Sequence, residues 1–142
     1  MAENPGTVRT FEDLRIYQEA RALANLIYEL TKRGPVVRDR SFVDQVRRSA
    51  VSVLSNIAEG FERETNAEFI RALYIAKGSS GELRAQVVLG ADQKYFTGDE
   101  CKELTSRCRK LSAGIYNPIR HLKRSPARRP DAPLKPLNPS TL

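Results

Sequence analysis

The chain has 142 residues, of which 40% are hydrophobic and 29% are charged, and its formal net charge at pH 7 is +7. A chain of this length forms one domain that buries its core without disulfides or a structural metal. It contains no run of about 18 apolar residues, which argues against a membrane-spanning helix, and its first residues lack the apolar segment of a secretion signal. We therefore expect a cytoplasmic protein.

Apolar residues begin to recur at helical spacing near Thr10, where Thr10 and Asp13 resemble a capping box. Gly34-Pro35 is expected to end this first helix, because glycine and proline commonly follow a helix end. A second helix is predicted from about Arg40 to Glu59. Gly60 suits the left-handed position that follows such a helix.

The second predicted helix carries an apolar line and a polar line side by side. Its apolar residues recur at spacings of three and four, which places them along one face. Small polar residues run beside this face, so we expect close helix contact and internal hydrogen bonds there. The apolar line comprises Val43, Val46, Ala50, Val53 and Ile57.

The third predicted helix opens at Thr65, which forms a capping box with Glu68, and ends near Tyr95. Gly78 and Gly81 lie in its middle, where glycine lowers helix propensity. Small residues inside a helix favour the close approach of another element. We therefore expect another helix to pass close to these two glycines and to Ser79 and Ser80, which lie between them.

The fourth predicted helix opens at Thr97 with a capping box to Glu100, and its buried line runs to Leu122. Pro118 lies inside this line and is expected to kink or shorten the helix. Cys101 and Cys108 lie two turns apart on one face, beyond disulfide reach. We expect both cysteines to be small buried residues.

Short loops join these segments, so neighbouring helices must run antiparallel. The predicted fold is all-α, an up-and-down antiparallel four-helix bundle over residues 10–123 that follows a flexible N-terminus at residues 1–9. Residues 124–142 hold five of the eight prolines and few apolar residues, which predicts a disordered, basic, proline-rich C-terminal tail. Such a tail either contacts an acidic surface such as nucleic acid or is a solubilising extension.

Polar residues of the second and third helices are interpreted as a structural hydrogen-bond network that fixes helix register. If the two polar lines face each other, Glu59 or Glu82 is partly buried and needs a cationic partner. Arg47 and Arg48 are available for this role. The alternative is a carboxylate pair that performs acid–base or metal chemistry. The predicted network comprises Gln45, Ser52, Asn56, Glu59, Ser79 and Glu82.

The sequence lacks the residue patterns that most enzymes need. It holds one histidine, His121, and no Glu-x-x-His pair, Cys-x-x-Cys pair or phosphate-binding loop of the Gly-x-x-x-x-Gly-Lys-Ser/Thr type. We therefore predict no catalytic residue, no metal site and no cofactor.

Basic residues are the remaining candidates for function. No helix-turn-helix punctuation or aromatic-rich strand is present, so nucleic-acid binding would depend on electrostatics and shape. The candidate nucleic-acid-binding residues are Arg47, Arg48, Arg71, Lys77, Arg120, Lys123, Arg124, Arg128 and Arg129.

Several stretches resemble the four-helix-bundle proteins of the 23S rRNA intervening-sequence family. The most specific is Gln45-Val-Arg-Arg-Ser-Ala-Val-Ser52 followed by Asn56-Ile-Ala-Glu-Gly-Phe61. Phe11-Glu-Asp-Leu14 and Ile75-Ala-Lys-Gly-Ser79 continue the resemblance, which covers about residues 10–123. A more distant likeness is to the accessory variability protein of diversity-generating retroelements.

The resemblance implies an up-and-down bundle that assembles as a ring-like homopentamer, a role with RNA and no enzymatic activity. The leading hypothesis is a non-enzymatic, homo-oligomeric bundle that binds RNA or other nucleic acid. The alternative is a protein-interaction adaptor that holds a ribosomal component or a reverse transcriptase. The more distant resemblance implies the reverse transcriptase as a partner.

Overall fold

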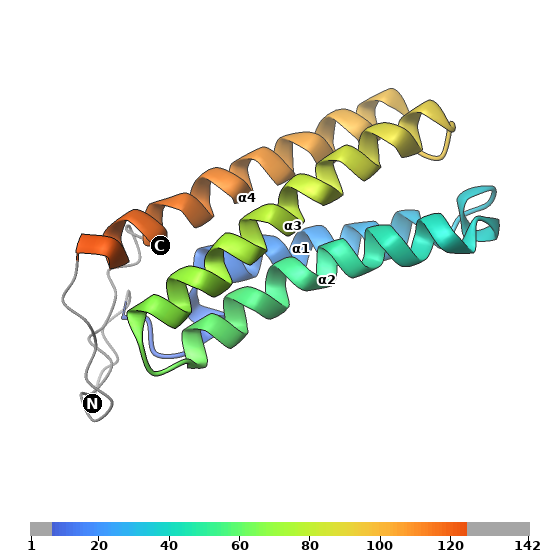
Figure 1. The fold of residues 1–142 in the computed structure, drawn as a ribbon. Coiled ribbons are helices and arrows are strands. Elements are labelled where there is room, and N and C mark those ends of the chain that lie inside the picture. The colour runs from blue at the N-terminus through green and yellow to red at the C-terminus, as the bar shows by residue number, and fades with distance from the viewer. Residues whose placement is uncertain (1–6, 125–142) are drawn as a thin grey trace.

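The computed structural model describes residues 7–124, which form four long helices and two short 3-10 helices, with no strand in that part of the chain (Figure 1). The prediction of an all-α, up-and-down antiparallel bundle is confirmed. The predictions for residues 1–6 and for the tail after Arg124 lie outside the described residues. The long helices are α1 (Arg15–Leu30), α2 (Arg40–Glu62), α3 (Asn66–Asp92) and α4 (Gly98–Arg124), and the short ones are η1 (Phe11–Asp13) and η2 (Val36–Arg38).

One apolar stripe from each long helix forms the core. All five residues of the apolar line predicted for α2 are buried, which confirms that prediction. α3 packs closely against both α2 and α4, whereas α1 packs mainly against α2 (Figure 1). The largest fully buried side chains are Leu14, Ile16, Leu23, Ile27, Val36, Ile57, Leu73, Leu83, Leu104, Leu111, Ile115 and Ile119.

The beginning of the bundle differs from the sequence prediction. The Asp13 carboxylate accepts hydrogen bonds from the N–H groups of Arg9 and Thr10, at 2.9 and 3.1 Å. These bonds cap η1, and α1 begins only at Arg15. Val8, in the segment expected to be flexible, is buried in the core.

Gly60 does not end α2, and the prediction of a left-handed cap at this residue is wrong. The helix continues to Glu62, and Gly60 lies against α3 instead. A Cβ atom on Gly60 would lie 2.7 Å from the Cβ of Ala72 and 2.9 Å from the Phe69 ring. The missing side chain therefore allows α2 and α3 to approach closely.

A second glycine makes the same kind of contact at the other end of α3. A Cβ atom on Gly90 would lie 2.6 Å from the rings of Phe42 and Phe96. Gly78 and Gly81 differ, because both are exposed and a Cβ atom on either would meet nothing within 4 Å. The expected close approach of a neighbouring helix therefore occurs at the buried Ser79 and Ser80, and not at the two glycines on either side of them.

Pro118 does not shorten α4, which continues to Arg124. The proline ring is buried beside Ile115 and Ile119 in the apolar stripe of the helix. Both cysteines are free, with Cys108 buried and Cys101 half-buried. No helix within residues 7–124 is long and apolar enough to cross a membrane.

We expect Gly60→Ala to lower the free energy of unfolding by about 1–3 kcal/mol, because the added methyl group overpacks the α2–α3 contact. Chemical denaturation followed by circular dichroism measures this change. Gly98→Ala is the control, because a Cβ atom there meets nothing within 4 Å and should change stability by less than about 0.5 kcal/mol. Equal stability of the two variants would contradict the close-contact role of Gly60.

Candidate nucleic-acid interface

Small polar residues join α2 to α3 near the middle of their contact. The hydroxyl oxygens of Ser52 and Ser79 lie 2.8 Å apart, within hydrogen-bond distance. The Asn56 side-chain amide donates to the Ser52 carbonyl oxygen at 2.8 Å and to its hydroxyl oxygen at 3.1 Å. The structure therefore brings together Ser52, Asn56 and Ser79 of the predicted network.

The next residue of α3 makes the equivalent bonds to α4. Ser80 is fully buried, and its hydroxyl donates to the Cys108 carbonyl oxygen at 3.0 Å. It also accepts a hydrogen bond from the Ser112 hydroxyl at 3.0 Å. Because Ser79 and Ser80 point to different neighbours, α3 is fixed in register with α2 and α4 at the same level.

The carboxylates predicted for this network lie outside it. Glu59 and Glu82 are exposed, so the expectation that one of them is partly buried is wrong. Glu59 pairs with Arg63, one turn further along α2, at 2.6 Å. Gln45 is also exposed. Within residues 7–124, no group of acidic, histidine or cysteine side chains has the arrangement of a metal site.

Arg47 is a packing residue between α1 and α2. Its Nε donates to the hydroxyl of Thr31 at 3.0 Å, and its guanidinium carbon lies 4.4 Å from the ring centroid of Tyr28. Arg48 is exposed on a different side of α2. These contacts hold Arg47 beside the last turn of α1, at the opposite end of the bundle from the end of α4 (Figure 1).

The exposed flank that α3 and α4 share carries an excess of positive charge. Residues 69–81 and 104–124 contain eight lysines and arginines but no aspartate or glutamate. The two stretches lie side by side, because Ser80 contacts Ser112 and Tyr74 contacts Lys123. We call this surface the α3–α4 basic face, and its basic residues are Arg71, Lys77, Arg109, Arg120, Lys123 and Arg124.

The cations of the α3–α4 basic face are not neutralised by neighbouring carboxylates. None of its six basic residues forms an ion pair with any other described residue. Five of the predicted nucleic-acid-binding residues lie here, whereas Arg47 and Arg48 lie elsewhere and Arg128 and Arg129 lie outside the described residues. The five are Arg71, Lys77, Arg120, Lys123 and Arg124.

The sequence prediction missed three residues of this surface, which are Arg109, Tyr116 and Tyr74. Arg109 and Tyr116 precede Lys123 at successive spacings of seven, which places all three along one line of α4. This spacing is the signal that would have added Arg109 and Tyr116 to the predicted set. Tyr74 has no such local signal, because its neighbour Lys123 is 49 positions away.

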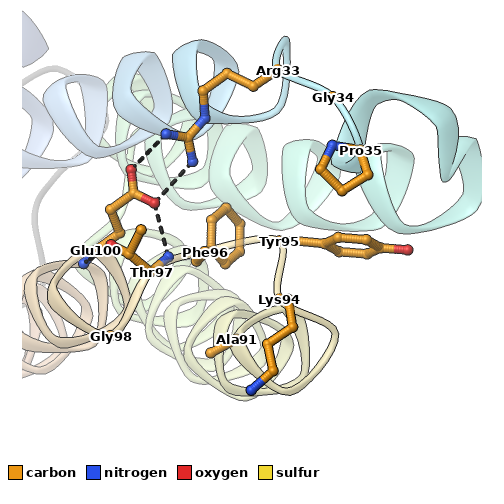
Figure 2. A pocket seen from close by; sticks show the side chains of 10 residues that line it. All are labelled: Arg33, Gly34, Pro35, Ala91, Lys94, Tyr95, Phe96, Thr97, Gly98 and Glu100. Carbon is orange, nitrogen blue, oxygen red and sulfur yellow. Dashed lines mark hydrogen bonds and ion pairs between the residues drawn. The ribbon is translucent and has the colours of Figure 1, made fainter.

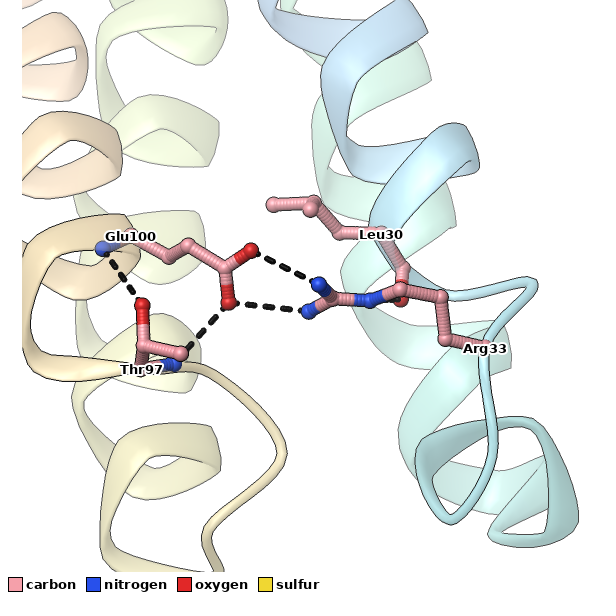
Figure 3. A network of polar contacts seen from close by, with 4 residues as sticks. All are labelled: Leu30, Arg33, Thr97 and Glu100. Carbon is pink, nitrogen blue, oxygen red and sulfur yellow. Dashed lines mark hydrogen bonds and ion pairs between the residues drawn. The ribbon is translucent and has the colours of Figure 1, made fainter.

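A cleft of about 550 Å³ lies at the opposite end of the bundle, where the α1–α2 and α3–α4 loops meet (Figure 2). Arg33 and Lys94 supply positive charge to its lining, but the guanidinium of Arg33 already pairs with both carboxylate oxygens of Glu100, each at 2.8 Å. Glu100 also accepts the Thr97 N–H at 2.9 Å (Figure 3). This paired carboxylate makes the cleft a poor site for an anion.

Residues 12–117 match the sequence model of the 23S rRNA-intervening sequence protein. The chain belongs to this family. A crystal structure of a protein of unknown function from the S23 ribosomal protein family of Bacteroides thetaiotaomicron VPI-5482 has a similar fold, with a TM-score of 0.67 and 21% sequence identity. The alignment covers 73% of this chain and 97% of that one, and at this identity it supports the fold alone. No curated protein matches the chain.

The family match includes part of the α3–α4 basic face. Tyr74, Arg109 and Tyr116 lie within the matched residues, whereas Arg120 and Lys123 follow the end of the match at residue 117. The Arg33–Glu100 pair also lies within it and joins the end of α1 to the start of α4. The Arg33–Glu100 pair therefore lies wholly inside the family region, whereas the Tyr74–Lys123 contact at the other end extends beyond it.

We expect Glu100→Gln to lower the free energy of unfolding by about 1 kcal/mol at pH 7, because it removes a two-pronged ion pair. Hydrogen bonds from Arg33 and then from the Thr97 N–H lower the pKa of Glu100. A lowered pKa stabilises the folded state above the unfolded pKa, and that stability disappears as the pH falls through the folded pKa. The variant should therefore lose less stability than the wild type on acidification below about pH 5.

Urea denaturation between pH 3 and pH 7 measures this dependence. Glu103→Gln is the control, because Glu103 forms an exposed pair with Arg107 one turn along the same helix. A similar loss of stability in both variants, with an unchanged pH profile for Glu100→Gln, would refute the role given to the Arg33–Glu100 pair.

Proposed function

We propose that this protein is a non-enzymatic, homo-oligomeric bundle that binds RNA in the cytoplasm. The observation that carries the proposal is the α3–α4 basic face, whose six lysines and arginines form no ion pair with another described residue. The description of the family, which refers to 23S rRNA, supports RNA as the ligand. Glu59 and Glu82 are both exposed and Glu59 pairs with Arg63, which agrees with a role in binding rather than catalysis.

Unpaired cations on a rigid helix pair suit contact with phosphates. Each phosphate that a lysine or arginine neutralises releases counterions, which drives binding at low salt and weakens it as salt rises. Oligomerisation presents several such faces to one RNA, so that weak individual contacts combine. The family resemblance favours five copies in a ring.

The outward surface of α3 supports self-association. Ile75 and Val88 are each 48% exposed and Leu89 is 52% exposed, although all three are large apolar residues. Gly78 and Gly81 lie between them along the helix, with open space where a side chain would be. A helix that is apolar on its outer as well as its inner side is normally covered on both, and we propose that a second copy of the chain covers this one.

RNA binding should weaken when the basic face loses its charge. We expect the triple change Arg109→Gln, Arg120→Gln and Lys123→Gln to reduce affinity for structured RNA at about 0.1 M salt. The slope of log affinity against log salt should fall by about 0.7–0.9 for each phosphate that the variant no longer neutralises. Fluorescence anisotropy across a salt series measures both quantities.

The matched control is Arg21→Gln, Lys32→Gln and Arg40→Gln, which removes the same charge from exposed positions on α1, its C-terminal loop and α2. Comparable weakening by both triple variants would show that binding depends on net charge and not on the basic face. Absence of RNA binding by the wild type at low salt would refute the proposed function.

Self-association should depend on the outer surface of α3. We expect Leu89→Glu to convert the oligomer into smaller species, because the new charge cannot be buried between copies without a large desolvation cost. Analytical ultracentrifugation measures the molar mass. Val37→Glu is the control, since Val37 is a similarly exposed apolar residue at 44% but lies on η2. An unchanged mass for Leu89→Glu would exclude this surface as the interface.

The same apolar surface favours a second candidate function. If the wild type is monomeric in solution, the exposed Ile75, Val88 and Leu89 fit the surface of a protein-interaction adaptor whose partner is another protein. A ribosomal component or a reverse transcriptase would then cover α3. Binding to such a partner, lost in Leu89→Glu and kept in Val37→Glu, would distinguish the adaptor from the RNA-binding oligomer.

A further inference from the structure

Two half-exposed tyrosines lie among the cations of the α3–α4 basic face. Tyr74 of α3 is 43% exposed and Tyr116 of α4 is 44% exposed. Burial of an aromatic ring stabilises the folded state, and these two rings gain only part of that stabilisation because they are half-exposed. Their exposed rings are therefore available to a ligand that stacks on them.

Basic side chains contact the rings without enclosing them. The Lys123 ammonium donates to the Tyr74 hydroxyl at 2.7 Å and lies 5.1 Å from the ring centroid, which places it toward the hydroxyl edge. The Arg120 guanidinium carbon lies 5.3 Å from the Tyr116 centroid. Tyr74 raises the pKa of Lys123 through this hydrogen bond, and Tyr116 adds a smaller electrostatic effect. Lys123 therefore contacts Tyr74, and Tyr116 precedes it by seven positions on the same line of α4.

We infer that the RNA bound on this face is single-stranded, with unpaired bases stacked on Tyr74 and Tyr116 and phosphates beside Arg120 and Lys123. The inference rests on the proposed function and names its ligand more closely. Every unpaired base offers a flat face to an aromatic ring, whereas in a duplex those faces are stacked on neighbouring base pairs. A duplex can use the cations of this surface but not its rings.

A third exposed tyrosine, Tyr28, packs against an arginine and serves as a comparison for the other two. Tyr28 is 38% exposed, but Arg47 lies 4.4 Å from its centroid and is held there by a hydrogen bond to Thr31. This closer cation covers one face of the ring, and the pair lies between α1 and α2 away from the basic face. Tyr28 is therefore a matched control for Tyr74 and Tyr116.

The first test compares a labelled 12-nucleotide oligouridine, which forms no stable duplex, with an RNA hairpin of equal charge whose two strands are joined by a non-nucleotide linker, so that it has no unpaired base. We expect Tyr74→Leu and Tyr116→Leu each to weaken oligouridine binding by about 5- to 100-fold, the size of one base stack. Hairpin binding should stay within about 2-fold of wild type. Tyr74→Phe and Tyr116→Phe keep the ring and should retain most of the affinity, and Tyr28→Leu should bind both RNAs like wild type.

A second readout follows stacking directly. The chain has no tryptophan, so Tyr116→Trp introduces a single reporter whose emission should be quenched by saturating oligouridine, whereas the emission of Tyr28→Trp should not change. Far-ultraviolet circular dichroism checks that each variant is folded.

The outcomes separate the two proposals. The inference that bases stack on Tyr74 and Tyr116 is refuted if the leucine variants lose hairpin and oligouridine binding equally. It is also refuted if saturating oligouridine does not quench the emission of Tyr116→Trp. In either case RNA binding that is lost in the Arg109, Arg120 and Lys123 triple variant still supports the proposed function. Failure of the wild type to bind both RNAs at low salt overturns both.

Discussion

The close packing of α3 between α2 and α4 is the constraint on which the rest of the structure depends. It is possible because the contact positions carry either no side chain, as at Gly60 and Gly90, or only a hydroxyl, as at Ser79 and Ser80. A buried hydroxyl without a partner is costly, so each serine tolerates only those sliding positions that keep its hydrogen bond. The bonds therefore convert tight packing into a defined register.

That register determines what lies on the outside of the bundle. With Ser80 opposite Ser112, the antiparallel course of α3 and α4 brings Tyr74 level with Lys123. Two stretches that each lack carboxylates then become one surface, and their charges add. The interior contacts of α3 and the basic face are thus consequences of the same alignment.

The two ends of the bundle use their cations differently. At the end with the α1–α2 and α3–α4 loops, Arg33 pairs with Glu100 and Arg47 covers Tyr28, so these arginines hold helices together. At the end where α4 finishes, Arg120 and Lys123 contact neutral groups and keep their full charge available. Arg47 therefore belongs to the contacts that pack α1 against α2 and not to the α3–α4 basic face.

The sequence by itself determined the helices and most of their buried faces, because apolar spacings of three and four and the Thr65–Glu68 and Thr97–Glu100 capping boxes are local signals. It could not decide the role of Gly60, since a left-handed cap and a close helix approach both require glycine. Nor could it decide whether Glu59 and Glu82 are buried, because that depends on how each helix is rotated against its neighbour. Only the tertiary structure placed Tyr74 beside Lys123, because contact between residues 49 positions apart depends on the register of packed helices and not on any local pattern.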